Sequence, residues 1–512
     1  MDYTMNKDTL TTSTVVFKGT EEQPVDIDFT LPDYCPDIQR ILKCQICPKI
    51  TSKNISADRL DVDGTTFVKL MYVDSVNSKI HCFEHSLPFS TSFNLKSIPD
   101  DVVSVVKSKV EYVNCRAVSP RRLDIHGAFS LSAKVFGKEH QEIISSIPAP
   151  DIEQKTTTLT SSDLIGIGQN QFTINEVLEI PQGKPMIESI VRVNTEVTLN
   201  DYKSIANKLI LKGEVIVKIL YISDSMEGEL ECIEYSIPIN QIMDVSGIDD
   251  GSICNVKLDV MNDRAEIRED SSNENHLIDI EVKLCATATA YMDHDIDLIT
   301  DIYSTKYDIN PVFKQTEIYR IMENIAENYI DKQSINFSEK NISKIIDAWS
   351  ELCSVSAKRE DNKIVFKGKY NVCILGIDSE NEPFYIERMM DFETSHDGDY
   401  NCPDIHLDID AKLTSISFRL VNPNEIEVRS EIAITGSVYC IYTLKVISEL
   451  SADENSLKSK ENHPAVTIYY ADPGESIWSI ARKYSTSVDA IKMENDIEED
   501  VIQERGMLLI PM

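Results

Sequence analysis

This sequence has few residues that interrupt regular structure and few charges that attract nucleic acid. Glycine and proline number 17 and 19 among 512 residues, and 42% of the residues are apolar, which excludes a disordered or collagen-like chain. Fifty Lys and Arg residues face 85 Asp and Glu residues, for a net charge of -35. Such a surface disfavours nucleic acid and anionic lipid, and it suits basic protein partners or simple solubility.

Long apolar runs and export signals are also missing. No segment approaches the roughly 18 apolar residues of a membrane helix, so no membrane insertion is expected. The start, Met1–Leu10, lacks the basic flank and apolar run of a secretory signal. We therefore expect a cytosolic protein whose twelve cysteines remain small buried thiols.

Motifs for catalysis and phosphate binding are absent as well. There is no Gly-x-Ser-x-Gly or His-Glu-x-x-His motif, and no Gly-Lys pair is followed by Ser or Thr. Cys44-Gln-Ile-Cys47 has the spacing of half a zinc site but lacks a second half. We predict a protein that is not an enzyme and has no cofactor or metal, with a metal-dependent hydrolase in the first module as the weakest alternative.

What the sequence does contain is one stretch that occurs three times. Asp37–Val73 aligns without a gap with Met186–Ile222 and with Asn341–Ile377, which indicates one module copied three times. The agreeing positions are apolar or glycine: Ile38, Ile187 and Ile342; Ile41, Ile190 and Ile345; Leu60, Leu209 and Ile364; Gly64, Gly213 and Gly368; Val68, Val217 and Val372. At the two cysteine positions the other copies have Val193 and Glu196, then Ala348 and Glu351. A metal therefore cannot belong to the shared framework.

Most of each copy has the two-residue period of β-strands. Apolar residues alternate with charged ones over Ile278–Leu284 and Ile426–Ile434, which predicts antiparallel sheets with one apolar face. The shared glycine falls between two such runs, where a bend or bulge would require it. We predict a mainly β protein of three repeated β-sandwich-like modules and a small α+β domain, with boundaries at residues 1–160, 172–312, 313–450 and 465–512.

Four segments are predicted to lie outside these strands. Ile38, Ile41 and Leu42 have helical spacing and predict a short helix. Glu317–Gln333 places its apolar residues on one helical face and predicts a packed connecting helix. The polar segments Asp151–Gln171 and Ser451–Asn462 predict connectors.

The C-terminal stretch, Val466–Met512, has the most specific pattern. A strand at Thr467–Tyr470 precedes a turn whose Ser476 caps a helix, a second helix follows near Ile491, and Met507–Pro511 closes the pattern as a strand. This order resembles the LysM domain, and Asp472-Pro-Gly-Glu-Ser-Ile-Trp-Ser-Ile-Ala481 with Leu508-Leu-Ile-Pro511 is similar to its signature. Trp478 is expected to be a core or edge anchor of this domain.

The LysM resemblance implies a shallow groove between two loops that binds N-acetylglucosamine polymers. Carried over by position, the groove consists of Gly474, Glu475, Ser476, Ile477, Val501, Ile502 and Gln503. The sequence departs from the family pattern at Arg505-Gly506 and at Ser485, and the domain has four basic and nine acidic residues, a charge of 4 - 9 = -5. The ligand is therefore left open between glycan and protein.

The remainder of the chain resembles the SPOCS domain, on Leu31-Pro-Asp-Tyr-Cys-Pro-Asp-Ile38 and on Val256–Tyr307 with its final Tyr303-Ser-Thr-Lys-Tyr307. SPOCS modules followed by one LysM domain are typical of the SipL type of clostridial spore coat morphogenetic protein. The resemblance implies a structural adaptor made in the mother-cell cytoplasm and recruited to the forespore surface and spore coat. It also implies a partner, the coat morphogenetic ATPase of the basal coat layer (SpoIVA-like), with other coat proteins.

Two functions from different classes follow. In the first, the LysM domain docks the coat ATPase and the β modules contact further coat proteins. In the alternative, the protein binds N-acetylglucosamine in cortex peptidoglycan. The missing export signal favours the first, because glycan strands lie across a membrane from the cytosol.

Overall fold

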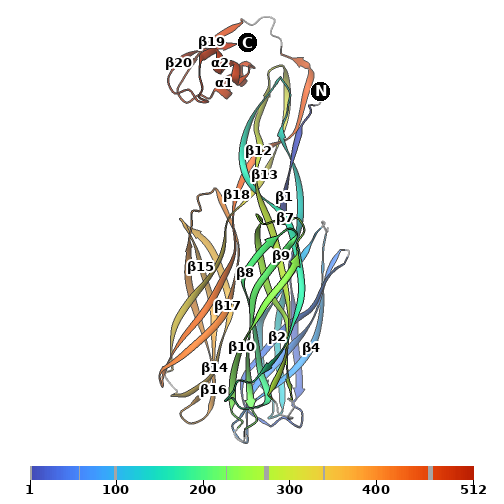
Figure 1. The fold of residues 1–512 in the computed structure, drawn as a ribbon, viewed down its shortest axis with the longest axis vertical. Coiled ribbons are helices and arrows are strands. Elements are labelled where there is room, and N and C mark those ends of the chain that lie inside the picture. The colour runs from blue at the N-terminus through green and yellow to red at the C-terminus, as the bar shows by residue number, and fades with distance from the viewer. Residues whose placement is uncertain are drawn as a thin grey trace.

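The fold consists of three copies of one pair of antiparallel sheets, and a small C-terminal domain lies at the far end of the molecule (Figure 1). The structure is a computed structural model, and it describes residues 3–56, 58–96, 101–225, 228–269, 276–337, 341–458 and 465–511. Every strand pair in it is antiparallel. The predicted class, mainly β with a small α+β domain at the end, is confirmed.

Each module has a repeat sheet, which contains the repeated stretch, and a long sheet. The repeat sheets have the orders β2-β3-β4, β8-β9-β10 and β14-β15-β16, and the long sheets β1-β6-β5, β7-β12-β11 and β13-β18-β17. The first module comprises β1 (Asn6–Thr30), β2 (Ile38–Ser56), β3 (Arg59–Asp74), β4 (Ile80–Asn94), β5 (Val103–Ala117) and β6 (Arg122–Ser146). The second comprises β7 (Ile152–Glu179), β8 (Ile187–Ile205), β9 (Lys208–Ser223), β10 (Leu230–Asp244), β11 (Ile253–Arg268) and β12 (Leu277–Ser304). The third comprises β13 (Tyr307–Asn336), β14 (Ile342–Glu360), β15 (Lys363–Asp378), β16 (Pro383–Asp397), β17 (Asp404–Asn422) and β18 (Glu425–Leu457).

The apolar residues of the repeat form the core between the two sheets of each module. In the first module Leu60, Val62 and Val68 of the repeat sheet pack with Leu123 and Ile125 of the long sheet. The second and third modules have cores at the equivalent positions between the corresponding sheets, with Leu209, Leu211 and Val217 in the second and Ile364, Phe366 and Val372 in the third. The predicted β-sandwich-like modules are therefore present, and the boundaries between them stay a prediction.

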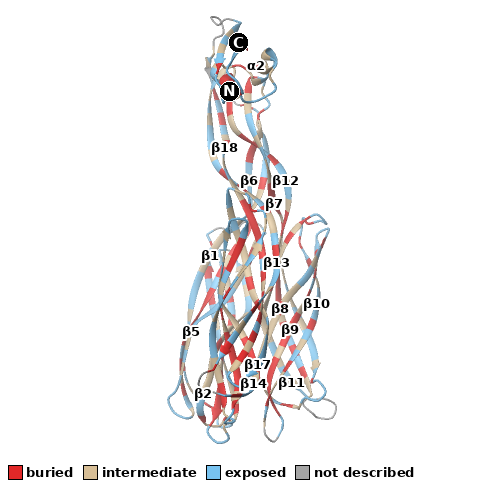
Figure 2. Ribbon diagram, turned by 90° about the vertical axis from the view of Figure 1, so that its left-hand side faces the viewer, coloured by how far each residue is buried: buried red, intermediate tan, exposed pale blue. Residues whose placement is uncertain are grey.

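Three strand pairs, β1 with β6, β7 with β12 and β13 with β18, continue beyond the sandwiches toward the C-terminal domain. We call this extension the stalk (Figure 1). Its interior is apolar and takes residues from all three modules: Leu10, Ile143, Ile296, Leu298, Ile318 and Val446. Buried residues continue up the stalk in Figure 2. The stalk therefore has a core of its own, which links the modules into one body.

The short helix predicted from Ile38, Ile41 and Leu42 is wrong, because these residues begin strand β2. The pairing with β3 is irregular twice, between Ile38 and Arg40 and between Ile41 and Lys43. Each extra residue at a β-bulge breaks the two-residue alternation and produces a three-residue spacing. The other copies have the same irregularities, at Ile187/Ser189 and Ile190/Arg192 and at Ile342/Lys344 and Ile345/Asp347.

The connecting helix predicted over Glu317–Gln333 is also wrong, because this segment lies inside strand β13. Ile318, Ile321 and Ile325 are buried with helical spacing, and the pairing with β18 shifts between Ile321 and Glu323. At this shift the strand passes from the stalk core, which holds Ile318, into the module core, which holds Ile325. A bulge and a change of core partner therefore produce the spacing of buried residues that is expected of a helix.

The polar connectors are mostly strand. Strand β7 begins at Ile152, so the Thr and Ser cluster of Asp151–Gln171 pairs with β12, and Ser161 and Ser162 are buried. Threonine favours strands, and pairing across the sheet overrides the polar composition of the segment. Of Ser451–Asn462, residues 451–457 continue strand β18 and residues 459–462 lie outside the described part of the chain.

Candidate functional site

The C-terminal domain is a two-stranded sheet, β19 (Val466–Ala471) with β20 (Gly506–Pro511), packed against helices α1 (Ile477–Tyr484) and α2 (Val488–Asn495). Each helix has a serine cap: the Ser479 N–H donates to Ser476 Oγ at 3.2 Å, and the Ala490 N–H donates to Ser487 Oγ at 3.1 Å. These contacts satisfy backbone donors that a helix start leaves free. The βααβ order predicted from the sequence is confirmed.

The two loops expected to form a binding groove lie side by side. The Gly474 N–H donates to the Ile502 carbonyl at 2.8 Å, the Ile502 N–H to the Glu475 carbonyl at 2.9 Å, and the Ile477 N–H to the Asp500 carbonyl at 2.9 Å. Ser476 and Val501 form an isolated β-bridge between the loops. The seven predicted groove residues are therefore neighbours in space, and their role in binding stays a prediction.

The side chains of these seven residues differ in what they can contact. Ile477 is 0% exposed and Ile502 is 7% exposed, and both belong to the core of the domain. The Glu475 carboxylate accepts from the Tyr469 hydroxyl at 2.8 Å and from the Asp472 N–H at 2.9 Å, and these two hydrogen bonds lower the pKa of Glu475. Gly474, Val501 and Gln503 remain exposed at the surface.

An exposed apolar face lies on the outer side of the two-stranded sheet, and the sequence analysis did not find it. Ile468 is 58% exposed, Tyr470 69% and Met507 55%, whereas Ala471, Leu508 and Ile510 face the core. Tyr470 pairs with Met507 across the two strands. The sequence does contain a sign of this face. Apolar residues occur on both sides of the two strands, and a domain of this size can bury only one side of its sheet.

The C-terminal domain is attached to the stalk through α1 and the residues that follow it. The Trp478 Nε1–H donates to Asp301 Oδ2 at 2.8 Å, and Arg482 forms an ion pair with Asp301 at 2.8 Å. Tyr303, two residues after Asp301 on β12, is buried against the Trp478 ring with centroids 4.9 Å apart, and its hydroxyl donates to the Thr486 carbonyl at 2.8 Å. Trp478 is thus an edge anchor of the domain, and its partner is the stalk.

We predict that Asp301→Ala releases the C-terminal domain from the stalk. The substitution removes a charged acceptor shared by Trp478 and Arg482, and hydrogen bonds to charged groups are worth about 1.5–3 kcal/mol each. Small-angle X-ray scattering should then show a larger maximum dimension than in the unaltered protein. The matched control is Asp297→Ala on the same strand, whose exposed carboxylate accepts from the Thr158 hydroxyl and should leave the scattering unchanged. Equal profiles for both variants would contradict the attachment.

Cys44 and Cys47, the predicted half of a metal motif, lie on strand β2 as free thiols. In the described ranges no three His, Cys, Asp or Glu residues are grouped so that they could hold a metal ion. Burial raises the pKa of Cys47 and, to about 12, that of Cys82, so neither is a thiolate at neutral pH.

Neither of the two helices in the described part of the chain is long or apolar enough to cross a membrane.

Comparison with known proteins bears on both parts of the chain. The family model described as "SipL, SPOCS domain" matches residues 37–118 and 186–268, and the LysM domain model matches residues 469–511. The third module has the same sheet order as the two that match. No curated protein and no solved structure matches the chain at a significant level. SPOCS and LysM domains are non-catalytic binding domains, and the SipL family points to spore coat morphogenesis.

Proposed function

From a chain that carries SPOCS domains of the SipL family and a C-terminal LysM domain, we propose a structural adaptor that assembles the spore coat. The LysM domain docks the coat morphogenetic ATPase of the basal layer, and the β modules contact other coat proteins. The adaptor is made in the mother-cell cytoplasm and is recruited to the forespore surface. It performs no catalysis and needs no cofactor.

One observation carries the docking proposal: the outer face of the LysM sheet is apolar and exposed. The domain that bears this face lies at the end of the molecule, away from the three modules (Figure 1). Ile468, Tyr470 and Met507 present apolar area that neither the domain nor the stalk covers. Exposed apolar patches on a soluble domain mark interaction surfaces, and aromatic residues commonly supply their strongest contacts. The domain has nine acidic and four basic residues, and this net negative charge suits a partner with basic residues.

We predict that Ile468→Asp with Tyr470→Asp reduces recovery of the coat ATPase from sporulating cells by roughly tenfold or more, since anchor residues each contribute about 2 kcal/mol. A pull-down with the full chain measures it. The control is Met493→Asp, which alters an even more exposed apolar residue on α2 instead of the sheet. Recovery that stays undiminished in the double variant, and also in a chain without residues 465–512, would exclude docking through this domain.

The alternative function is binding of N-acetylglucosamine in cortex peptidoglycan. It is supported by the two hydrogen-bonded loops, which bring Gly474, Val501 and Gln503 together at the surface. Sedimentation of the full chain with purified cortex peptidoglycan separates the two functions. Saturable binding that Gln503→Ala and Val501→Asp weaken would favour the glycan, and no sedimentation would favour the adaptor.

A further inference from the structure

One position of the repeat is occupied by a charged residue in every module, a cation in the first two and a carboxylate in the third, and the fold brings the three charges to one junction. Lys43, Arg192 and Asp347 occupy equivalent positions in the gap-free alignment of the three copies. Each follows the second bulge of its strand, at Ile41/Lys43, Ile190/Arg192 and Ile345/Asp347. The bulge directs these side chains out of their own sandwich, toward the neighbouring modules.

An apolar cluster surrounds the junction, and it too is built from equivalent positions. Met71, Leu220 and Leu375 occupy one position of the repeat and are buried together, and Leu42, Val191 and Ile346 occupy another. At these two positions each module contributes apolar residues, which do not distinguish one module from another. The third module alone adds a buried tryptophan, Trp349, where the other copies have Gln45 and Asn194. The remaining distinction at the junction comes from the charged residues.

The second module contacts the third through a buried charge cluster. Arg192 forms an ion pair with Asp347, and Lys218 Nζ lies 2.7 Å from Asp347 Oδ1. The Asp347 side chain is 0% exposed and that of Arg192 is 8% exposed. The guanidinium also lies 4.1 Å from the centre of the Trp349 ring. Removing one partner of such a group would leave a charge without compensation in the interior.

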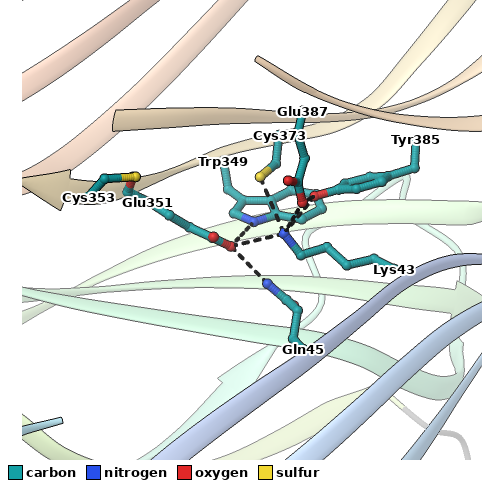
Figure 3. A network of polar contacts seen from close by, with 8 residues as sticks. All are labelled: Lys43, Gln45, Trp349, Glu351, Cys353, Cys373, Tyr385 and Glu387. Carbon is teal, nitrogen blue, oxygen red and sulfur yellow. Dashed lines mark hydrogen bonds and ion pairs between the residues drawn. The ribbon is translucent and has the colours of Figure 1, made fainter. Parts of the chain in front are cut away.

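The first module contacts the third through Lys43, whose side chain is 10% exposed (Figure 3). Its Nζ donates to the Tyr385 hydroxyl at 2.6 Å and lies 2.7 Å from Glu387 Oε1 and 3.3 Å from Glu351 Oε1. Burial opposes its charge, yet Cys373, Glu351 and Glu387 around it raise the pKa of Lys43. Gln45 and the Trp349 indole also donate to Glu351, at 2.8 Å and 3.0 Å. The third module therefore supplies the acceptors and the other two supply the cations.

We propose that the position of Lys43, Arg192 and Asp347 determines which module packs beside which. The surface of the third module around Asp347, Glu351 and Glu387 is an interaction surface whose partners are modules with a cation at this position. The first and second modules cannot replace the third, because a further cation would enter a junction that already holds Lys43, Arg192 and Lys218. Buried ion pairs contribute little net stability compared with apolar contacts, but they penalise wrong pairing by several kcal/mol.

A charge exchange in the full chain tests this inference. All variants carry Lys218→Gln, so that the exchanged pair has no second cation beside it. Arg192→Asp and Asp347→Arg, each alone, should raise amide hydrogen exchange in β8 and β14 by roughly 100-fold. Together, the two substitutions restore an opposite pair and should return exchange to within about tenfold of the Lys218→Gln chain. Light scattering should show that the exchanged chain is monomeric.

The control is the same exchange in an exposed ion pair of the third module, Lys369→Asp with Asp391→Lys, which should change nothing. If either single reversal prevents folding, the exchanged chain decides alone: a soluble, protected monomer supports the inference. An exchanged chain that is no better protected than the worse single variant, or that aggregates, overturns it. In that case the position matters for packing and not for the choice of partner.

Discussion

Gly213→Ala is expected to lower the free energy of unfolding of the second module by about 3 kcal/mol or more, at the severe end for a single substitution. A Cβ built on Gly213 would lie 2.2 Å from the Thr198 carbonyl oxygen, a backbone atom that cannot rotate away. The carbonyl approaches so closely because strand β8 has an irregularity between Leu199 and Asp201, opposite this glycine. Relief of the clash requires that the paired strands separate at the centre of the repeat sheet.

The same geometry exists in the other two copies. A Cβ on Gly64 would lie 2.4 Å from the Lys49 carbonyl oxygen, and one on Gly368 would lie 2.6 Å from that of Ser354. The shared glycine was predicted to mark a bend or bulge between two runs, but each glycine lies inside one continuous strand, β3, β9 or β15. The irregularity lies on the neighbouring strand instead. The close approach of that strand, and not a special backbone angle, excludes any side chain here.

Urea unfolding monitored by hydrogen exchange in β8 and β9 measures the effect of Gly213→Ala. The control is Gly251→Ala in an exposed turn, where the nearest atom to an added Cβ is Asp249 Oδ1 at 3.5 Å. That substitution should change stability by less than about 0.5 kcal/mol. A cost below about 1 kcal/mol for Gly213→Ala would mean that β8 can shift by the required distance, and the steric explanation would fail.

Ile477→Arg is expected to unfold the LysM domain while the three modules stay folded. Ile477 is fully buried in a core of about a dozen side chains, and an unpaired buried charge costs several kcal/mol. A domain of fewer than 50 residues has a small free energy of unfolding, which such a cost exceeds. Amide exchange should therefore become fast throughout α1, α2, β19 and β20 and remain slow in β3, β9 and β15.

Because Ile477 and Ile502 are buried, substitutions at these two residues cannot test the predicted groove. A charge at Ile477 or Ile502 would abolish docking by unfolding the domain, whether or not a partner binds the loops. Val501→Arg is the matched variant, because Val501 lies on the same loop pair with its side chain exposed. It should leave exchange in α1 and α2 unchanged. Persistent protection in the Ile477→Arg chain would show that the side chain is not held in the core.

The LysM domain was predictable from the sequence almost completely. Its helices and the Ser476 cap depend on contacts between residues that lie close together in the chain, so local patterns determine them. Its two strands pair across the whole domain, from Val466 with Pro511 to Ala471 with Gly506, but each is a short apolar run that the sequence marks by itself. The burial of Ile477 was predictable from helical spacing alone, because it shares a face with Ile480 and Ala481. The exposure of Tyr470 was less evident, since the sequence does not tell which side of a two-stranded sheet the helices cover.

The two strand segments that were wrongly predicted to be helices have related physical causes. Periodicity reports the face on which a side chain lies only while a strand pairs regularly with a single core. At Ile38–Lys43 the bulges change the period, and at Ile318–Ile325 the strand passes from one core to another. Both effects depend on the neighbouring strand or module, which local propensity does not describe.

The sequence by itself determined that this protein is three copies of a β module and one LysM domain, because internal repetition and short-range patterns survive without knowledge of contacts. Only the tertiary structure decided how the copies assemble. In the alignment Lys43, Arg192 and Asp347 are simply a position where the copies disagree. In the fold they meet at one buried junction, since Coulomb attraction acts between residues that are near in space however far apart they lie in the chain.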